Sequence, residues 1–391
     1  MHAFKTALLR AGQILLWLII TFCLVASAAP QFLDRIYYRG AVSGHFDGAR
    51  FFNPDGEDTV RPPTGGNRSG FLLRYLAGDD RPEWPARIGT EQDRPPERVE
   101  GGAMRVTWVG HATVLIQTDG LNILTDPIWS DVAGPFDRFG PRRVAAPGIA
   151  FERLPKIDLV LVSHNHYDHM DLTTLKRLWA RDRPLIVTSL GNDTILRTAG
   201  IAARGVEWGR RVPVRDGIEV VATRNHHWGS RWFADRNRAL WSSFVIRLPG
   251  GNIFFAGDTG AGDYRWADAA AGYGPIRFAM LPIGAFRFQE GQMGIGSHIG
   301  PMDAIRVWNR LGRPTTLPIH WGTFRLSWEG YWTPPRMLRA LQACAGDTSG
   351  RFAPQNIGRA WDIPAVTPPP PPVADARLAA CGTDPRVTAL R

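Results

Sequence analysis

Cysteine is scarce in this sequence, with three residues among 391. No CxxC pair occurs, so a metal bound by this chain is not held in a cysteine cage. Cys23 lies in the N-terminal apolar stretch, which leaves Cys344 and Cys381. In an oxidising compartment these two either pair or stay as free thiols, because connectivity is not readable from sequence.

Blocks of like charge and internal repeats at solenoid spacing are also absent. The net charge is nevertheless +10, from 46 basic and 36 acidic residues. Such an excess fits nucleic acid, an anionic membrane surface or an acidic substrate, and it fits an arginine-rich solvated surface equally well. The 15 tryptophans suit either a core or a lipid-facing surface.

The N-terminus contains no acidic residue before Asp34. Lys5 and Arg10 precede the apolar residues 14–26, and a small-residue Ala-Ser-Ala cleavage site closes the run. This layout predicts that residues 1–29 are a signal peptide or an uncleaved membrane anchor. The body would then be exported, to the periplasmic side of a bacterial-type envelope or anchored to its inner membrane. A buried N-terminal core helix is the alternative.

The rest of the chain divides into three parts by composition. Residues 30–103 are rich in Gly, Pro and Arg and form an extension of turns and loops. Residues 104–345 mix strands and helices, which predicts an α/β layered domain. Residues 346–391 lose periodicity and contain a polyproline run, so we expect a partly disordered tail. Strands are expected at 105–109, 113–118, 121–125, 157–162, 184–189, 218–222, 243–248, 252–256 and 278–283, and helices at 172–180, 303–311 and 335–343.

The segment SHNHYDHMD follows the strand expected at 157–162 and holds three histidines and two aspartates. In an extended chain, side chains two apart share a side, so His164 and His166 face one point. Asp168 and His169 are adjacent and join that cluster only if the chain bends. Imidazole and carboxylate ligands suit zinc, so a metal site is favoured over a merely polar loop.

Other donors also follow expected strands. TRNHHWGS carries His226 and His227, IFFAGDTG carries Asp258, and LPIHWGTF carries His320. Asp171 begins a helix as an N-cap and would hold the metal loop from its far side. His320 alone would more often be a core histidine, but donors placed repeatedly at strand ends indicate a site on the rim of a sheet.

The motifs together resemble the metallo-β-lactamase superfamily, and within it the branch of N-acylphosphatidylethanolamine-hydrolysing phospholipases D. The resemblance covers roughly residues 104–340, with a further similarity in HFDGARFFNP at 45–54. It rests on TWVGHATVLIQTDGLNILTDPIWS, RFGPRR, SHNHYDHMD, NHHWGSR, FFAGDTG, LPIGAFR, HIGPMDAIRV and IHWGTF, which occur in this order. It implies a four-layer αβ/βα sandwich that binds two zinc ions per chain.

The resemblance also implies how the donors divide between the two zinc ions. His164, His166 and His227 would bind one ion, Asp168, His169 and His320 the other, and Asp258 would bridge both. His227 is preferred because the family places its ligand directly before the tryptophan matched by Trp228, and His226 is the alternative.

Catalysis is expected to involve Asp168, Asp258 and His298. His298 would protonate the leaving alcohol, unless it is a surface loop histidine. Asp126 and His111 would orient ligands from behind the site. Their alternatives are a turn aspartate before proline and a packing residue at a strand start.

These residues predict a dinuclear zinc phosphodiesterase. A hydroxide shared by the two ions would cleave N-acylphosphatidylethanolamine-like lipids into phosphatidic acid and N-acylethanolamine. The same metals would also serve another ester, such as a thioester, a lactone or a soluble phosphodiester, and an inactive binding scaffold is a further alternative. The expected partners are a phospholipid or other ester and a membrane surface. Nucleic acid is not expected, because the chain carries an export signal.

Overall fold

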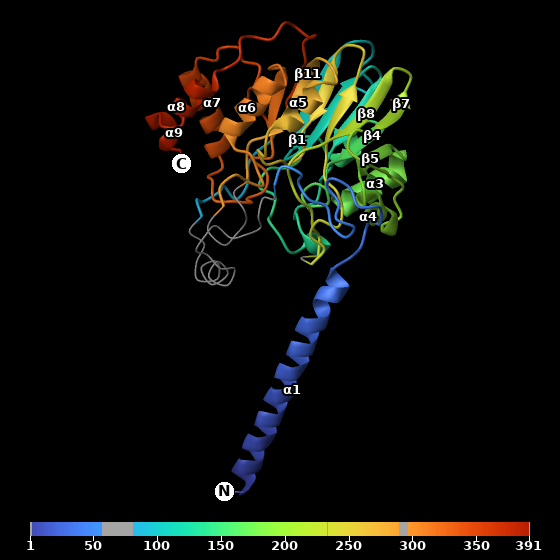
Figure 1. The fold of residues 1–391 in the computed structure, drawn as a ribbon, viewed down its shortest axis with the longest axis vertical. Helices are drawn as coiled ribbons and strands as arrows, with labels where there is room; N and C mark the ends of the chain where they lie inside the picture. Colours follow the sequence, from blue (N-terminus) through green and yellow to red (C-terminus); the bar gives the residue numbers. More distant parts are fainter. Residues whose placement is uncertain (1, 57–80, 233, 289–295, 391) are drawn as a thin grey trace.

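Two β-sheets pack face to face in the computed structural model, which describes residues 2–56, 81–232, 234–288 and 296–390 (Figure 1). The first sheet has the order β13-β1-β2-β3-β4-β5-β6 and the second β12-β11-β10-β9-β8-β7. The strands of the first are β1 (Met104–Gly110), β2 (Thr113–Thr118), β3 (Leu121–Thr125), β4 (Leu159–Val162), β5 (Leu185–Ser189), β6 (Arg204–Val206) and β13 (Ala360–Asp362). Those of the second are β7 (Arg211–Arg215), β8 (Ile218–Thr223), β9 (Ser243–Arg247), β10 (Asn252–Phe255), β11 (Ile276–Pro282) and β12 (Thr315–Ile319).

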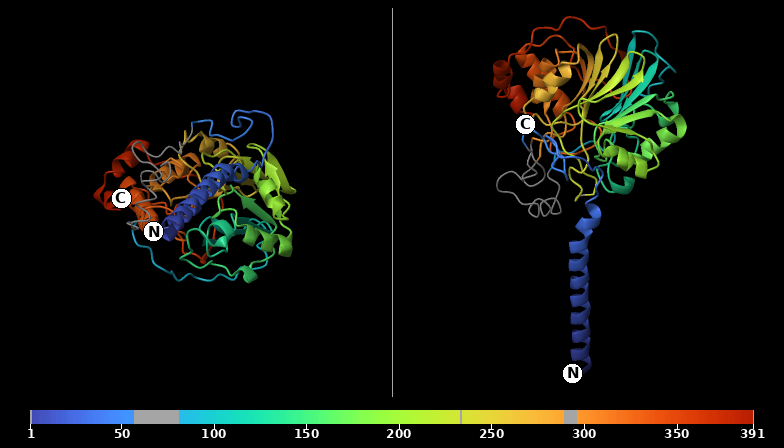
Figure 2. Two further views of the ribbon diagram at one scale, coloured as in Figure 1. Left: turned by 90° about the horizontal axis from the view of Figure 1, so that it is seen from below. Right: turned by 45° about the vertical axis from the view of Figure 1, so that its right-hand side comes forward.

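Helices cover the outer faces of both sheets, as the views in Figure 2 show. The first sheet is covered by α3 (Leu172–Asp182) and α4 (Asn192–Thr198). The second is covered by α5 (Arg265–Ala271), α6 (Pro301–Arg310) and α7 (Thr333–Ala345), with α8 (Asp375–Cys381) and α9 (Pro385–Thr388) beside α7. Two short 3-10 helices, η1 (Pro135–Asp137) and η2 (Phe151–Arg153), lie in the loop before β4. The predicted four-layer αβ/βα architecture is confirmed.

The central strands form because their side chains point alternately to two buried faces and are apolar on both. In β4, Leu159 and Leu161 pack between the sheets, whereas Val160 and Val162 pack under α3 and α4. Successive side chains of a strand point to opposite faces, so a strand buried on both faces is apolar throughout. The turn in LPGGN joins β9 to β10 antiparallel, and Gly251 adopts φ 104° there, a conformation open mainly to glycine.

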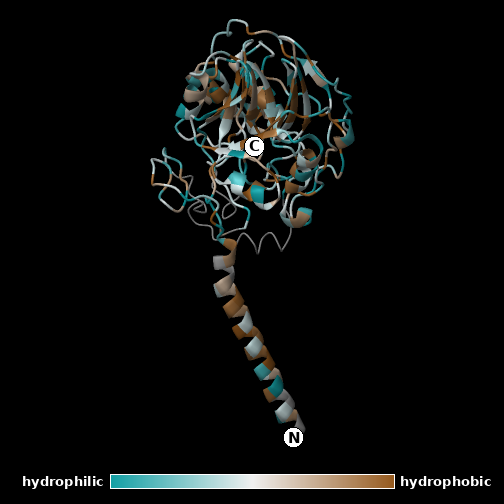
Figure 3. Ribbon diagram, turned by 90° about the vertical axis from the view of Figure 1, so that its right-hand side faces the viewer, coloured by the Kyte–Doolittle hydropathy of each residue, from teal (hydrophilic) through white to brown (hydrophobic). Residues whose placement is uncertain are grey.

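The N-terminal helix α1 (His2–Leu33) projects away from the body, with hydrophobic residues along most of its length (Figure 3). Its stretch Phe4–Ala28 is long and apolar enough to cross a membrane, and none of it is buried in the body. The alternative of a buried core helix is therefore wrong. The chain after α1 packs on the body, where Phe46 and Phe51 join Trp241 in a small buried cluster. Residues 57–80 of the expected extension lie outside the described residues.

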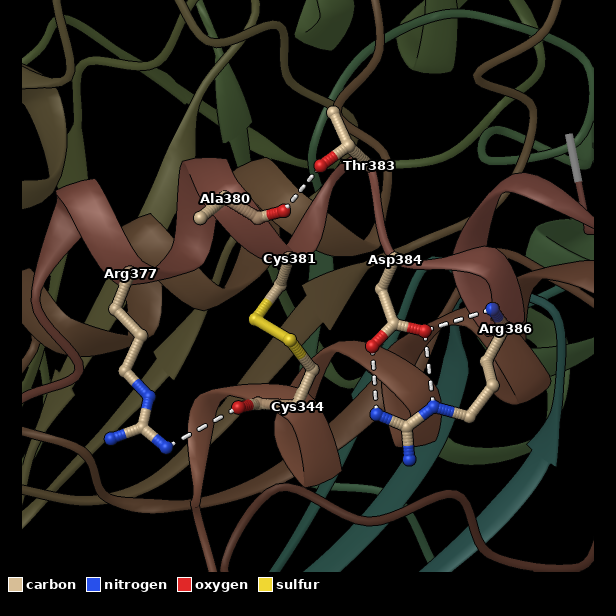
Figure 4. Close-up of a disulfide and its surroundings, with 7 residues drawn as sticks. All are labelled: Cys344, Arg377, Ala380, Cys381, Thr383, Asp384 and Arg386. Atoms are coloured by element: carbon tan, nitrogen blue, oxygen red, sulfur yellow. Dashed lines mark hydrogen bonds and ion pairs between the residues drawn. A yellow bond between two sulfur atoms is a disulfide. The ribbon is translucent and has the colours of Figure 1, made fainter.

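The last part of the chain, expected as a partly disordered tail, is described up to residue 390 and packs on the body. Its strand β13 pairs antiparallel with β1. A disulfide joins Cys344 of α7 to Cys381 of α8, and Arg377 donates a hydrogen bond to the Cys344 carbonyl (Figure 4). Of the two alternatives left open by the sequence, the structure has the cysteines paired. The expected boundary at residue 345 does not separate the tail from the sheet.

Candidate metal centre

Segments that follow four strands meet at one edge of the sandwich. Residues 163–171 follow β4, 224–228 follow β8, 256–260 follow β10, and His320 directly follows β12. Within the second sheet, β10 and β12 are both parallel to β11, and β9 is antiparallel to both β8 and β10. The carboxyl ends of β8, β10 and β12 therefore lie at the same edge, where polar loop residues converge.

A first group of donors consists of three histidines from two of these loops. His164 Nε2 lies 2.8 Å from His166 Nδ1, and the ring of His227 is 4.7 Å and 5.3 Å from those of His164 and His166. One ligand atom from each residue lies within 4.8 Å of the others. All three are buried or half-buried, so the group offers neutral nitrogen donors in a space shielded from water.

A second group lies beside the first and contains a carboxylate. Asp168 Oδ2 is 3.4 Å from His169 Nε2 and 3.5 Å from His320 Nε2. His111 Nε2 lies 2.9 Å from the same carboxylate oxygen. A bend after Tyr167 brings Asp168 and His169 to the cluster, as the sequence requires if both are to be ligands.

Asp258 lies between the two groups. Its Oδ2 is 2.9 Å from His320 Nε2, 3.1 Å from His169 Nε2 and 4.0 Å from His227 Nε2. The side chain is 1% exposed. A single carboxylate oxygen thus faces nitrogens from both groups, which is the placement that a bridging ligand requires.

Hydrogen bonds behind the donors set which ring nitrogen faces inward. His169 Nδ1 donates to Asp126 Oδ2 at 2.6 Å, and His227 Nδ1 donates to the Ser297 carbonyl at 2.9 Å. In the neutral form of each ring Nδ1 carries the proton, so Nε2 is the atom that would offer its lone pair to the cluster. Asp126 also accepts from the backbone and hydroxyl of Ser163. Asp126 therefore lies behind the His169 ring, on the side away from the cluster.

The backbone around the donors is held in conformations that are costly for side-chain-bearing residues. His111, Asp126 and His320 have φ of 54°, 30° and 63°. Such left-handed residues are uncommon and cluster at functional sites. The His320 amide donates to the His111 carbonyl, the His111 amide to Thr323 Oγ1 and the Asp126 amide to the Leu161 carbonyl, so hydrogen bonds hold all three. Asp171 caps α3 by accepting from two backbone amides, as predicted.

Burial keeps most of the imidazoles neutral. It lowers the pKa of His164 and His227 well below the usual range and that of His166 to about 3. Burial and the charge of His320 lower the pKa of His111 to about 3. Neutral imidazole is the form that binds metal, so these rings need no deprotonation at neutral pH.

Two histidines next to the carboxylates behave in the opposite way. Burial alone would lower the pKa of His169 and His320, but the neighbouring carboxylate charges, chiefly Asp258, outweigh it. The pKa of His169 rises well above its usual value and that of His320 rises to about 9. Burial would likewise raise the pKa of Asp168 and Asp258, but the charge of His169 holds both well below the usual range. The carboxylates are therefore ionised.

Several buried donor atoms fit a cation. Among the described residues, His166 Nε2, His227 Nε2 and Asp258 Oδ1 are buried and have no hydrogen-bond partner. Buried polar atoms are rarely left without a partner in native proteins, and such exceptions mark a bound ion or another function. Nitrogen and carboxylate oxygen donors at these spacings are also the ligand types that zinc takes. The residues present therefore fit divalent metal ions.

The structure separates the two adjacent histidines of the loop after β8. His227 lies in the first donor group, whereas His226 faces away and its Nδ1 lies 3.0 Å from Asp55 Oδ1. His298, expected near the metals, is 9% exposed and its Nδ1 is 3.6 Å from Asp258 Oδ2. Burial lowers the pKa of His298 to about 3, so its ring is neutral.

Asn53 contacts the site from a part of the chain where sequence reasoning assigned no function. Its Nδ2 donates to the His227 carbonyl at 2.9 Å, and its Oδ1 accepts from the His227 amide at 3.2 Å. Asp55 pairs with Arg224 and His226 at the start of the same loop. The sequence feature that could have indicated this contact is the HFDGARFFNP motif, which ends one residue after Asn53. This motif resembles the family, but nothing in it indicated a function.

Known proteins resemble this chain in sequence and in fold. The pattern described as a β-lactamase superfamily domain matches residues 121–321. The N-acyl-phosphatidylethanolamine-hydrolyzing phospholipase D 1 of Caenorhabditis elegans is 33% identical over 270 residues, which are 66% of this chain and 75% of that protein. The mitochondrial enzyme of the same name in Saccharomyces cerevisiae is 31% identical over 64% of this chain and 54% of its own length.

An uncharacterized protein of Mycobacterium tuberculosis is 34% identical over 62% of this chain, and the match spans 65% of the mycobacterial protein. Two solved structures share the fold. An isothiocyanate hydrolase from Delia radicum gut bacteria has a TM-score of 0.54 and 20% identity, over 66% of this chain and 98% of that one. A possible metal-dependent hydrolase from Veillonella parvula has a TM-score of 0.54 and 15% identity, over 66% and 99%.

Proposed function

Because the chain belongs to the metallo-β-lactamase superfamily, we propose that it is a dinuclear zinc-dependent phosphodiesterase. Its substrates would be N-acylphosphatidylethanolamine-like lipids. Water adds to phosphorus, the bond from phosphorus to the ethanolamine oxygen breaks, and the products are phosphatidic acid and N-acylethanolamine. The names of the worm and yeast relatives support this choice of substrate.

The placement of Asp258 carries the proposal. One zinc would be held by His164, His166 and His227, and the other by Asp168, His169 and His320, with Asp258 shared. The distances of 2.9 Å, 3.1 Å and 4.0 Å from Asp258 Oδ2 to nitrogens of both groups support this division. When bound, the two ions supply an activated water at neutral pH and offset negative charge on the phosphoryl oxygens.

The chain's own residues contribute positioning and proton handling. Asp126 and Ser297 hold His169 and His227 with Nε2 facing inward. His111 donates to Asp168 and fixes its carboxylate. His298 would act on the leaving oxygen. As a neutral ring it donates a hydrogen bond there, and it delivers a full proton only once the negative phosphodiester has raised its pKa.

The N-terminal helix supports a lipid substrate. With α1 in a bilayer and its basic end inside, the body would be exported and would face the outer surface of that membrane. The paired cysteines agree with an oxidising compartment.

The test is to assay the purified full-length protein, loaded with zinc, on N-acylphosphatidylethanolamine in mixed micelles and on a soluble phosphodiester. Metal analysis on the same samples should give two zinc ions per chain. Asp258→Asn tests the bridging carboxylate, and Asp216→Asn, at an exposed turn before β8, is the matched control. We expect lipid turnover in the wild type and in the control only.

Other outcomes assign other functions. Turnover of the soluble diester alone, or of a thioester or lactone, would reject the lipid substrate and keep the metal chemistry. Well under two zinc ions per chain, with no hydrolysis of any ester, would indicate a binding scaffold instead.

A further inference from the structure

The loop of residues 133–142, here called the rim loop, presents aromatic and basic side chains to solvent. Phe136 is 78% exposed and Phe139 is 64% exposed. Among the described residues beyond α1, no other phenylalanine is an exposed large hydrophobic residue. Arg138 and Arg142 are exposed in the same loop and form no ion pair with a described residue. Apolar rings flanked by arginines are the composition of a surface that lies on anionic lipid.

The rim loop is next to the end of α1. Arg35, two residues after that helix ends, lies over the Trp232 ring at 4.3 Å, and Trp232 is 6.1 Å from the Phe136 ring. A cavity of about 420 Å³ is lined by Arg35 after the helix, by Phe136 of the rim loop and by Trp232, among other residues. Phe136 thus lies beside the point where the chain passes from the body to the apolar helix, and Phe139 follows it in the same loop.

The connection between helix and body is short and held firmly. Asp34 pairs with Arg238 at 2.5 Å and with Arg50 at 3.0 Å. Tyr37 donates to Asp235 at 2.7 Å. From Ala28, where the apolar stretch ends, to Leu33, where the helix ends one residue before Asp34, the rise is only about 8 Å, at about 1.5 Å per residue. That is close to the thickness of one headgroup layer, roughly 5–8 Å, so a body docked at Asp34 lies against the bilayer surface.

Hydrogen bonds also connect this region to the segment 163–171, which carries four of the metal donors. Asp235 accepts from the Arg231 amide, and the Arg231 guanidinium donates to the carbonyls of Asn165 and Met170 at 3.0 Å and 2.9 Å. Asn165 lies between the donors His164 and His166, and Met170 directly follows His169. The rim loop itself is tied to the start of α3, because Thr173 donates to Asp137. The side of the body that faces the membrane is therefore the side that carries the candidate metal centre.

We propose that α1 is retained as an anchor and that the rim loop, through Phe136 and Phe139, contacts the same bilayer. The occupant of this surface is the membrane in which α1 sits. This deepens the proposed function, because the metal centre is then held at the lipid surface, but the contact itself does not depend on which ester is hydrolysed.

The test uses the full-length chain in vesicles of phosphatidylethanolamine and phosphatidylglycerol. Cys23→Ser removes the one free cysteine among the described residues. Cysteines placed one at a time by Phe136→Cys, Phe139→Cys and Val366→Cys are then labelled with a fluorophore. Val366 is the control, since it is 42% exposed and lines a cavity with Gly274, just before β11, and Thr315, the first residue of β12, at the opposite ends of these strands from the donors.

We expect brominated lipid to quench the labels at 136 and 139 several-fold more than the label at 366, and aqueous iodide to do the reverse. Equal quenching at all three positions overturns the proposal. Labels shielded from iodide yet not quenched by bromine would assign the loop to a protein partner and also overturn it. An intact mass showing that α1 has been removed from membrane-extracted protein would do the same.

The outcome is separable from the proposed function. Quenched labels on a protein that hydrolyses no N-acyl lipid would reject the substrate and leave the surface intact. Turnover in detergent micelles, with unquenched labels in vesicles, would reject the surface and leave the substrate intact.

Discussion

The two donor groups should bind metal with different pH dependence. In the metal-free protein, the rings of His164, His166 and His227 are already neutral at pH 7. His320 has a pKa of about 9, and the pKa of His169 is also raised well above its usual value. A metal that enters the second group must therefore displace protons, whereas a metal that enters the first displaces none.

The size of the pH effect on metal affinity follows from the pKa of His320. At pH 7 the ring is about two pH units below its pKa, so roughly one molecule in a hundred is deprotonated, and displacing the proton weakens metal binding by about a hundredfold. Affinity should rise about tenfold per pH unit from His320 alone, and about a hundredfold if His169 also releases its proton. The sign is fixed: a raised histidine pKa weakens metal binding below that pKa, and the effect disappears above it.

The assay is a zinc titration against a chromophoric chelator at several pH values between about 6.5 and about 8, with proton release measured in weak buffer. We expect one ion whose affinity hardly changes with pH and releases almost no proton, and a second that releases one to two protons. His320→Gln should remove one of these protons. Two ions with the same pH slope, or no proton release at all, would refute this account of the second group.

Four further experiments test individual contacts. Asp258→Asn should keep the fold but lose most turnover and lower the zinc content, and an unchanged rate would remove Asp258 from the mechanism. His298→Ala should slow esters with poor leaving groups more than activated esters, and equal slowing of both would remove its role at the leaving oxygen. Asn53→Leu leaves the buried amide and carbonyl of His227 without their partner, at about 1–3 kcal/mol, so we expect lower zinc occupancy with an unchanged circular dichroism spectrum; full occupancy would show that the loop holds itself. Replacing Cys344 and Cys381 by serine should lower the free energy of unfolding by up to about 4 kcal/mol, from their separation of 37 residues, and a chemical denaturation curve identical to that of the wild type would contradict this.

Most of the central strands and the longer helices could be predicted from the sequence, because their apolar pattern is strong and local. The strands β1 to β5 and β8 to β11 overlap predicted runs, and α3, α6 and α7 overlap predicted helices. The edge strands could not be predicted in this way. β7 contains Pro213 and is mostly exposed, and β13 is a three-residue piece of a proline-rich tail. Their pairing depends on a neighbouring strand rather than on their own propensity.

The candidate site, too, could be predicted where the pattern is local and could not be predicted where it depends on distant contacts. The grouping of His164 with His166 follows from strand geometry, because residues two apart share a side. The choice of His227 over His226 came only from a resemblance, since adjacent residues at a strand end are equivalent until the chain bends. Asn53 lies 174 residues before His227, and no local pattern indicates a contact of that range. The pairing of Cys344 with Cys381 likewise depended on the packing of α8 on α7.

The disulfide also encloses the strand that closes the first sheet. β13 lies in the segment of chain between Cys344 and Cys381, so the crosslink restricts how far this strand can move when it detaches from β1. Chemical reduction would remove this restraint. The uncovered backbone of β1 would then be free to pair with another molecule, because unpaired strand edges are templates for self-association. Reduced protein should accordingly aggregate sooner than the oxidised protein.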